Sequence, residues 1–294
     1  MTDRSSFLDG PLSLSKGPRG WRRLRLPRGF IFIVPLLVFL AVTFGVPLVG
    51  VVMRSLGSSE GISLKYFNEV IQTQAYWKIM LNTFRVSALV TLMTCLIGYP
   101  LAYWISRLNR TAQIIAVTLV ILPFWTSVLV RTYAWIIILG NRGLVNETLL
   151  KSGLIDEPMS LVFNETGVAI GMIHVLMPFL VLPLLAVMIG VDQRLVLVAK
   201  SLGARPWAAF WRVYFPLTFP ALAAGAILVL ILSLGFYVTP ALLGGGRVPM
   251  IATVLDTLIN RMPRWEIASA LSIILLGCSL ILFALYRRLD GVFK

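Results

Sequence analysis

The sequence predicts an all-α polytopic membrane protein with six transmembrane helices, and three observations support this fold class. Of the 294 residues, 58% are hydrophobic and 13% are charged, whereas a soluble domain carries about 25% charged residues. Six continuous apolar stretches reach the length of about 20 residues that a membrane-spanning helix needs. Lysine and arginine gather in alternate connecting segments, which is typical of the cytoplasmic loops of membrane proteins.

The six predicted spans follow one another with short or moderately long connections. They are Phe30–Met53, Thr83–Ile105, Ala112–Leu139, Gly167–Gly190, Phe219–Val238 and Ile267–Leu285. Several contain prolines, which we expect to kink the helices because neighbouring helices can satisfy the freed backbone groups. Between the spans, segments 141–166 and 250–261 each contain a short amphipathic piece that predicts a surface helix.

The basic residues predict the orientation of the chain. Segments 1–29, 106–111, 191–218 and 286–294 hold most of the 26 lysines and arginines. Both termini are therefore expected in the cytoplasm, with a basic arm at 1–29, a transmembrane domain at 30–290 and a short tail at 291–294. Anionic lipid headgroups account for the basic charge, so lipid is an expected partner and nucleic acid is not.

The sequence offers little material for catalysis. His174 is the single histidine, and Cys95 and Cys278 lie inside apolar runs, so no catalytic residues and no metal site are expected. The phosphate-binding pattern G-x-x-x-x-G-K-[ST] is missing, so the chain is not expected to be an enzyme, and ATP and Mg²⁺ would be bound by a partner ATPase. The spans have no central carboxylate, which weakens but leaves open a self-contained secondary carrier.

A basic elbow at 191–218 interrupts the apolar pattern between the fourth and fifth spans. Segment 191–202 predicts a helix that ends at Gly203, and Pro206 predicts the first turn of a second helix. One aromatic face, at spacings i, i+3, i+4 and i+7, is formed by Trp207, Phe210, Trp211 and Tyr214. Such a helix can lie on lipid or fit a cleft on a partner, and the pattern alone does not decide between the two.

The elbow resembles the cytoplasmic motif of permeases of binding-protein-dependent ABC importers, E-A-A-x-x-x-G, nine residues, then I-x-L-P. Leu197-Val198-Ala199, Gly203 and Val213-Tyr214-Phe215-Pro216 keep that spacing, with Leu197 in place of Glu and Val198 in place of Ala. The resemblance implies a coupling helix that sits in a groove of the ATPase. The residues assigned to coupling are Ala199, Lys200, Ser201, Leu202, Gly203, Ala204, Arg205, Pro206, Trp207, Phe210 and Pro216.

Three further stretches resemble the spermidine/putrescine permease group. They are LPFWTSVLVRTYAWIIILGNRGLVN (122–146), LMPFLVLPL (176–184) and GFYVTPALLGGG (235–246). The resemblance spans about 30–290 and implies a type I ABC importer permease fold in the bacterial inner membrane. It also implies a second homologous permease subunit, two ATPase subunits and an extracytoplasmic solute-binding protein. The implied cargo is a polyamine such as spermidine or putrescine.

The candidate pathway residues are Trp125, Arg131, Tyr133, Trp135, His174, Tyr237 and Asp256. Placing the charged side chain of Arg131 in lipid would cost about 2.5–3.5 kcal/mol of free energy. Arg131 is therefore expected to face a water-filled cavity or protein, where it contacts substrate or a partner permease. The neighbouring aromatic residues predict either a cation-binding wall or an interfacial belt. His174 is either a packing residue or a pathway ligand, and Asp256 can attract a cation. Because the spans lack acids, a zwitterionic or anionic amino-acid-like conjugate stays an alternative cargo.

Overall fold

The computed structural model describes residues 30–58 and 61–290. The predicted basic arm at 1–29 and the tail at 291–294 lie outside the described residues. Residues from Val49 onward form one compact unit, and those up to Leu48 form a separate one. In that separate unit lies most of α1 (Phe30–Leu56), which continues through Pro35 and Pro47.

Six helical segments of the described chain are long and apolar enough to cross a membrane, which confirms the predicted class. They are Ile33–Leu56, Gln74–Ser106, Val128–Lys151, Glu165–Gly190, Pro206–Leu234 and Trp265–Ala284. Five of them overlap the predicted spans, although the second begins at Gln74 rather than Thr83 and the fifth at Pro206 rather than Phe219. The third differs in position and in continuity.

The prediction of one helix over Ala112–Leu139 is wrong. The structure has α4 (Arg110–Ile121), the 3₁₀ turn η1 (Leu122–Trp125) and α5 (Val128–Leu139). Pro123 has no N–H to donate to the preceding turn. The Thr126 hydroxyl donates to the Pro123 carbonyl oxygen at 2.8 Å, which competes with continued backbone pairing. The apolar run therefore breaks where proline and threonine coincide.

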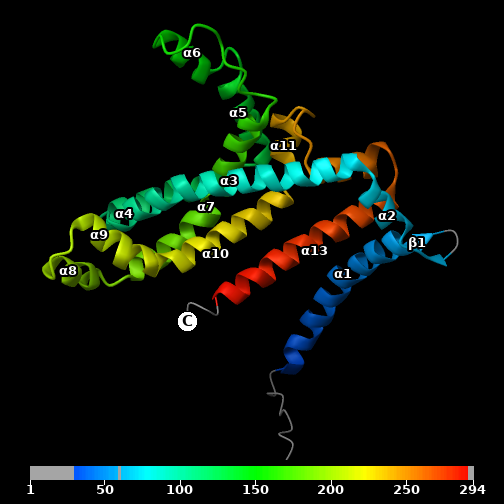
Figure 1. Cartoon of the computed structure of the whole chain (residues 1–294), viewed down its shortest axis with the longest axis horizontal. Helices are drawn as coiled ribbons and strands as arrows, with labels where there is room; N and C mark the ends of the chain where they lie inside the picture. The colour runs from blue at the N-terminus through cyan, green and yellow to red at the C-terminus, as the bar shows by residue number, and fades with distance from the viewer. Residues whose placement is uncertain (1–29, 59–60, 291–294) are drawn as a thin grey trace, which may run out of the picture. The chain divides into compact units, whose positions relative to one another are not determined.

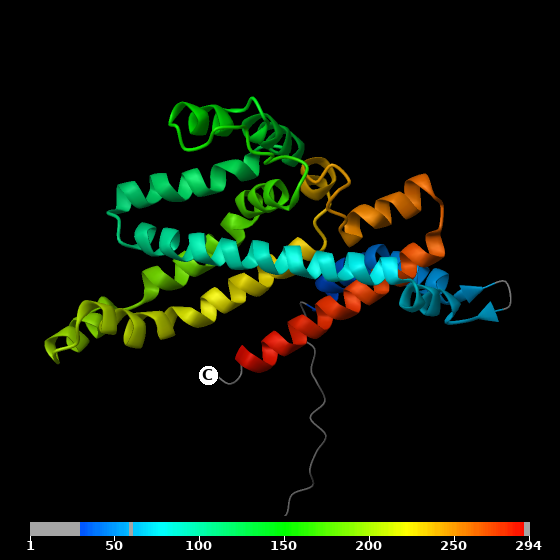
Figure 2. The same cartoon turned by 45° about the horizontal axis from the view of Figure 1, so that its top comes forward.

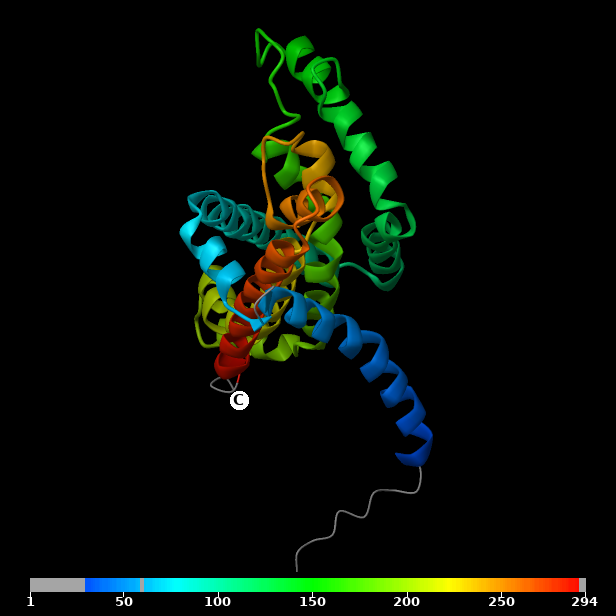
Figure 3. The same ribbon diagram turned by 90° about the vertical axis from the view of Figure 1, so that its right-hand side faces the viewer.

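A tight turn joins α5 to α6 (Leu144–Lys151), and Gly143 makes it possible. A β-carbon on Gly143 would lie 2.3 Å from the carbonyl oxygen of Ile137, so a larger residue cannot take this position. Figure 3 shows α5 and α6, in green, extending past α7. The helix α6 confirms the short helix predicted within 141–166.

The remaining peripheral elements are short, apart from α13 (Trp265–Asp290). A two-residue antiparallel hairpin pairs β1 (Gly57–Ser58) with β2 (Gly61–Ile62), and α2 (Lys65–Gln72) follows it. Later in the chain, α11 (Val238–Leu243), α12 (Ile251–Asp256) and the π turn η3 (Thr257–Arg261) precede α13. The helix α12 confirms the short helix predicted within 250–261.

The core is formed by α3 (Gln74–Ser106), α7 (Glu165–Gly190) and α10 (Phe215–Leu234), which lie side by side in Figures 1 and 2. Leu180 of α7 is fully buried at their meeting point. A β-carbon on Gly98 would lie 2.7 Å from Leu180, and one on Gly225 would lie 2.8 Å from it. The two glycines therefore let α3 and α10 approach α7 closely, as small residues do in membrane helix packing.

Candidate functional site

The first half of the elbow is a capped helix, α8 (Gln193–Ser201), as predicted. Asp192 caps its start by accepting from the Arg194 N–H at 2.9 Å. At its end, the N–H of Gly203 donates to the Lys200 carbonyl, and the N–H of Ala204 donates to the Ala199 carbonyl. This is a Schellman cap, whose residue after the cap takes a left-handed conformation. Gly203 supplies it with φ +87°, which is why glycine suits this position.

The second half of the elbow continues directly into the fifth membrane segment. Pro206 begins α9 (Pro206–Ala209), as expected, and a π turn η2 (Phe210–Tyr214) joins it to α10. The π turn ends two residues before Pro216, whose missing N–H cannot close an ordinary α-helical bond. The elbow is therefore mechanically continuous with α10 through one widened turn.

The predicted aromatic face divides into two parts. Trp207 is 73% exposed and Trp211 is 43% exposed, while Tyr214 is 1% exposed. Phe210 is half-buried, and its ring lies 5.4 Å from Tyr103 of α3 in an edge contact. Only the two tryptophans are thus available to another molecule, because Phe210 and Tyr214 pack within this chain.

Around the exposed tryptophans, α8 and the turn after it add apolar and basic surface. Leu202 is 84% exposed, and Lys200, Ser201, Arg205 and Pro216 are also exposed. Leu197 and Val198 are exposed as well, at positions where the importer motif has Glu and Ala. A partner that touches α8 at Leu197 and Val198 would therefore make an apolar contact with this chain. In the sequence, the signal for such a contact is a pair of apolar residues within a basic connecting helix.

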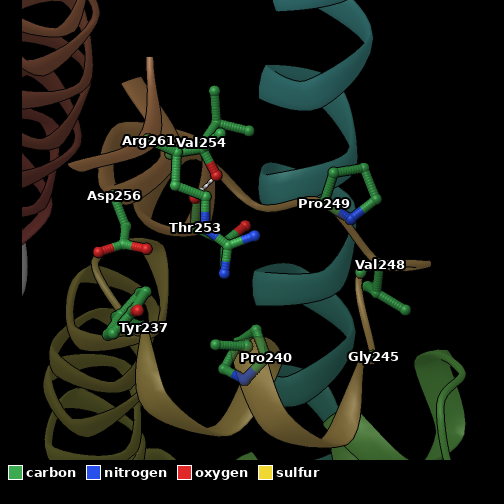
Figure 4. Close-up of a pocket in the computed structure, with 12 residues that line it drawn as sticks. Tyr237, Pro240, Gly245, Val248, Pro249, Thr253, Val254, Asp256 and Arg261 are labelled. Carbon is green, nitrogen blue, oxygen red and sulfur yellow. Dashed lines mark hydrogen bonds between the residues drawn. The ribbon is translucent and has the colours of Figure 1, made fainter. Parts of the chain in front are cut away.

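At the other end of α3 lies a pocket of about 430 Å³, called here the polar pocket. Its lining comprises Tyr237, Pro240, Ala241, Gly245, Gly246, Val248, Pro249, Thr253, Val254, Asp256, Thr257 and Arg261. The structure therefore brings together Tyr237 and Asp256, two predicted pathway residues from separate segments. Figure 4 shows Arg261 reaching into the pocket between them and Val248.

Asp256 is the acceptor within the polar pocket. Its carboxylate accepts from the Asn260 side-chain amide at 2.7 Å, and Tyr237 lies beside it in the lining of the pocket. Partial desolvation, then the neighbouring carboxylate of Asp256, raises the pKa of the Tyr237 phenol, while the positive charge of Arg261 opposes the rise. The phenol therefore stays protonated and remains a donor throughout the physiological range. Sequence reasoning missed Arg261, although a basic residue at the end of an amphipathic loop helix was a usable signal.

Arg131 lines a second, mostly apolar pocket of about 390 Å³, called here the arginine pocket. The other lining residues are Phe124, Val128, Val175, Phe179, Gly235, Phe236, Tyr237 and Val238. No carboxylate is among them, and the buried Arg131 Nε finds no acceptor within the described residues. Tyr237 lines both pockets, so it forms a shared wall between them.

The other predicted pathway residues do not form a common wall around Arg131. Trp125 is 88% exposed and Tyr133 is 55% exposed, so neither lines the arginine pocket. Trp135 instead packs on His174, donating its indole N–H to His174 Nδ1 at 3.2 Å. Within the described residues, these three aromatic side chains therefore do not enclose Arg131 together, and their role in the pathway stays a prediction. His174 has the contacts of a packing residue.

A many-helix membrane unit with a surface elbow at one end and a polar pocket at the other is the architecture of a solute permease. Comparison with known proteins identifies the family. Residues 94–291 match the family model described as "binding-protein-dependent transport system inner membrane component". The chain belongs to this family. It is a multi-pass inner-membrane permease component of a binding-protein-dependent importer.

Individual relatives support the assignment. The spermidine/putrescine transport system permease protein PotB of Haemophilus influenzae is 35% identical over 215 residues, covering 72% of this chain and 74% of that protein. The putative 2-aminoethylphosphonate transport system permease protein PhnU of Salmonella typhimurium is 27% identical, covering 87% and 90%.

A solved bacterial alginate ABC transporter, in complex with an alginate pentasaccharide-bound periplasmic protein, has a similar fold. Its matching chain has a TM-score of 0.75 and 19% sequence identity, covering 90% of this chain and 94% of that one. At this identity the likeness supports the type I importer permease fold alone.

Proposed function

We propose that this permease passes a polyamine such as spermidine or putrescine from an extracytoplasmic binding protein to the cytoplasm. The single observation that supports this cargo most is the similarity to PotB over most of the chain. Asp256 adds a carboxylate at the polar pocket, where it can attract a cationic amine. In this proposal the polar pocket faces the outside, and both termini and the elbow face the cytoplasm.

ATP is hydrolysed by two partner ATPase subunits, which bind ATP and Mg²⁺, and one of them docks at the elbow of this chain. The support for this docking is the exposed Trp207, Trp211 and Leu202 beside a glycine-capped helix end. A second homologous permease subunit completes the pathway. Its position would cover the face of α5 on which Leu129, Val130 and Ile137 are exposed.

The cargo is tested with the cognate binding protein and with vesicles. We expect spermidine or putrescine to raise the melting temperature of the binding protein. We also expect ATP to drive uptake of the polyamine only in vesicles that contain the whole complex. Gradient-driven uptake by this chain alone would instead show a self-contained carrier. Reporter fusions at both termini test the orientation.

A zwitterionic or anionic amino-acid-like cargo is a second candidate, favoured by the arginine pocket. A guanidinium without a neighbouring carboxylate suits a carboxylate or phosphonate better than an amine. We expect Arg131→Gln to abolish uptake of such a cargo and to leave polyamine uptake nearly unchanged. Stabilisation of the binding protein only by an acidic solute would overturn the polyamine assignment.

A further inference from the structure

Helix α3 contacts both regions of interest. One end of α3 contacts the backbone that forms the polar pocket, and the cyan helix in Figures 1 and 2 runs from there toward the elbow. Between Thr83 and Tyr103 the helix rises about 30 Å, at 1.5 Å per residue. One unbroken helix therefore spans the distance between the polar pocket and the elbow.

At the elbow, α3 is fastened by a cation held over two aromatic rings. The guanidinium carbon of Arg107, the C-cap of α3, lies 4.9 Å from the ring centre of Tyr103 and 5.2 Å from that of Tyr214. One turn earlier, the Tyr99 hydroxyl and the Thr218 hydroxyl of α10 are 2.9 Å apart. These contacts join the end of α3 to the π turn and to α10.

Ring contacts continue from this point to the exposed surface of the elbow. Tyr103 meets Phe210 at 5.4 Å, and Phe210 meets Trp211 at 5.4 Å. Trp211 in turn meets the exposed Trp207 at 5.4 Å. A force on Trp207 thus reaches α3 through rings in direct contact.

At the opposite end, α3 holds the backbone that forms the polar pocket. The side-chain amide of Asn82 donates to the Pro249 carbonyl at 2.9 Å. The buried Thr83 hydroxyl accepts from the Ile251 N–H at 2.9 Å. Pro249 lines the pocket, and Ile251 begins α12, which carries Asp256.

Between its ends, α3 continues past Pro100, which removes one backbone hydrogen bond. Gly98 lies two residues earlier, where the close approach of Leu180 supports α3 from the side. Packing against α7 therefore holds the helix together at the position where a bend is easiest.

We propose that α3 couples the elbow to the polar pocket, with Arg107 and Asn82 as the positioning residues at its two ends. Displacement of the elbow moves α3 through the Arg107 ring contacts, and α3 moves Pro249 and Ile251 through Asn82 and Thr83. The same contacts transmit a change in the pocket back to the elbow, because coupling is reciprocal. This inference rests on the proposed docking of an ATPase at the elbow.

The test uses the assembled transporter in membrane vesicles and compares Arg107→Ala and Asn82→Ala with the unchanged protein. ATPase rates are measured with and without the binding protein loaded with its solute. We expect the basal rate and ATPase co-purification to be kept, while stimulation by the loaded binding protein falls about tenfold. Exposed neighbours provide matched controls, Arg110→Ala beside Arg107 and Lys78→Ala one turn before Asn82, and both should keep full stimulation.

The double variant sharpens the test, because two residues on one path do not act independently. In the double variant Arg107→Ala with Asn82→Ala, stimulation should fall about tenfold, no more than in each single variant. If the two losses multiply instead, the residues act independently, and a shared path is contradicted. Full stimulation in Asn82→Ala would overturn the proposal. Since Asn82 is half-exposed, this variant is informative even if Arg107→Ala lowers the amount of folded protein.

Failure of this inference is distinguishable from failure of the docking proposal. If the elbow does not dock an ATPase, Trp207→Ala will leave co-purification unchanged. If docking holds and α3 is not the coupling element, Trp207→Ala will weaken co-purification while Asn82→Ala keeps full stimulation.

Discussion

The elbow and the polar pocket, at opposite ends of α3, are built on different physical principles. The elbow is contiguous in sequence, and backbone conformation at Gly203 and Pro206 shapes it. The pocket combines the α10–α11 junction with α12 and η3, and its backbone is held by side chains of α3. Local geometry therefore governs the first region, while contacts distant in sequence govern the second. Variants should affect the two regions in correspondingly different ways.

The largest expected effect follows from breaking the local geometry of the elbow. Gly203→Leu places a branched side chain at φ +87°, a strain that costs about 1–3 kcal/mol. We expect transport and ATPase co-purification to fall about 10- to 100-fold, while the amount of membrane-inserted protein is unchanged. Gly203→Asn is the matched control, because asparagine tolerates the left-handed conformation. Normal co-purification and transport by Gly203→Leu would show that the docking role is wrong.

The next effect separates the two halves of the aromatic face. Trp207→Ala removes an exposed ring, so we expect about tenfold weaker ATPase co-purification and an unchanged melting temperature. Phe210→Ala removes a ring packed on Tyr103, so it should destabilise the permease by about 3 kcal/mol. Co-purification and thermal melting, measured on both variants, check the division. Equal melting temperatures would show that Phe210 is not part of the core.

The smallest expected effect concerns the pocket and requires the polyamine assignment to hold. Asp256→Asn removes the pocket carboxylate, so we expect the KM for a cationic amine to rise up to about fivefold with kcat unchanged. Glu157→Gln removes an exposed acid outside the pocket and serves as the control. A changed kcat with an unchanged KM would mean that Asp256 acts on Tyr237 or Asn260 rather than on the cargo.

Much of the site could be predicted where the signal was local. The cap of α8 at Gly203, the start of α9 at Pro206 and the short helix that ends at Asp256 all depend on residues within one or two turns. Local steric rules decide such features, so single residues at fixed spacings were sufficient. The broken third span shows the limit, because Pro123 was interpreted as a kink although Thr126 turns it into a break.

Other features needed the tertiary structure. The spacing of Trp207, Phe210, Trp211 and Tyr214 placed them on one face, but α3 covers Phe210 in part and Tyr214 fully, and the two tryptophans stay exposed. Trp125, Tyr133 and Trp135 are close to Arg131 in sequence, but within this chain Trp135 packs on His174 of α7 and the other two rings are exposed. A helical pattern specifies which residues share a face, and the neighbouring helix decides how that face is used.

The sequence by itself determined the membrane class, the number of membrane-crossing segments and the family, because hydrophobicity over about 20 residues and motif spacing are one-dimensional properties. Only the tertiary structure decided which aromatic rings stay exposed, that Tyr237 meets Asp256, and that Asn82 and Arg107 fasten opposite ends of α3. These contacts join residues far apart in the chain. They depend on how the helices pack against one another, as α3, α7 and α10 do around Leu180 where Gly98 and Gly225 leave room.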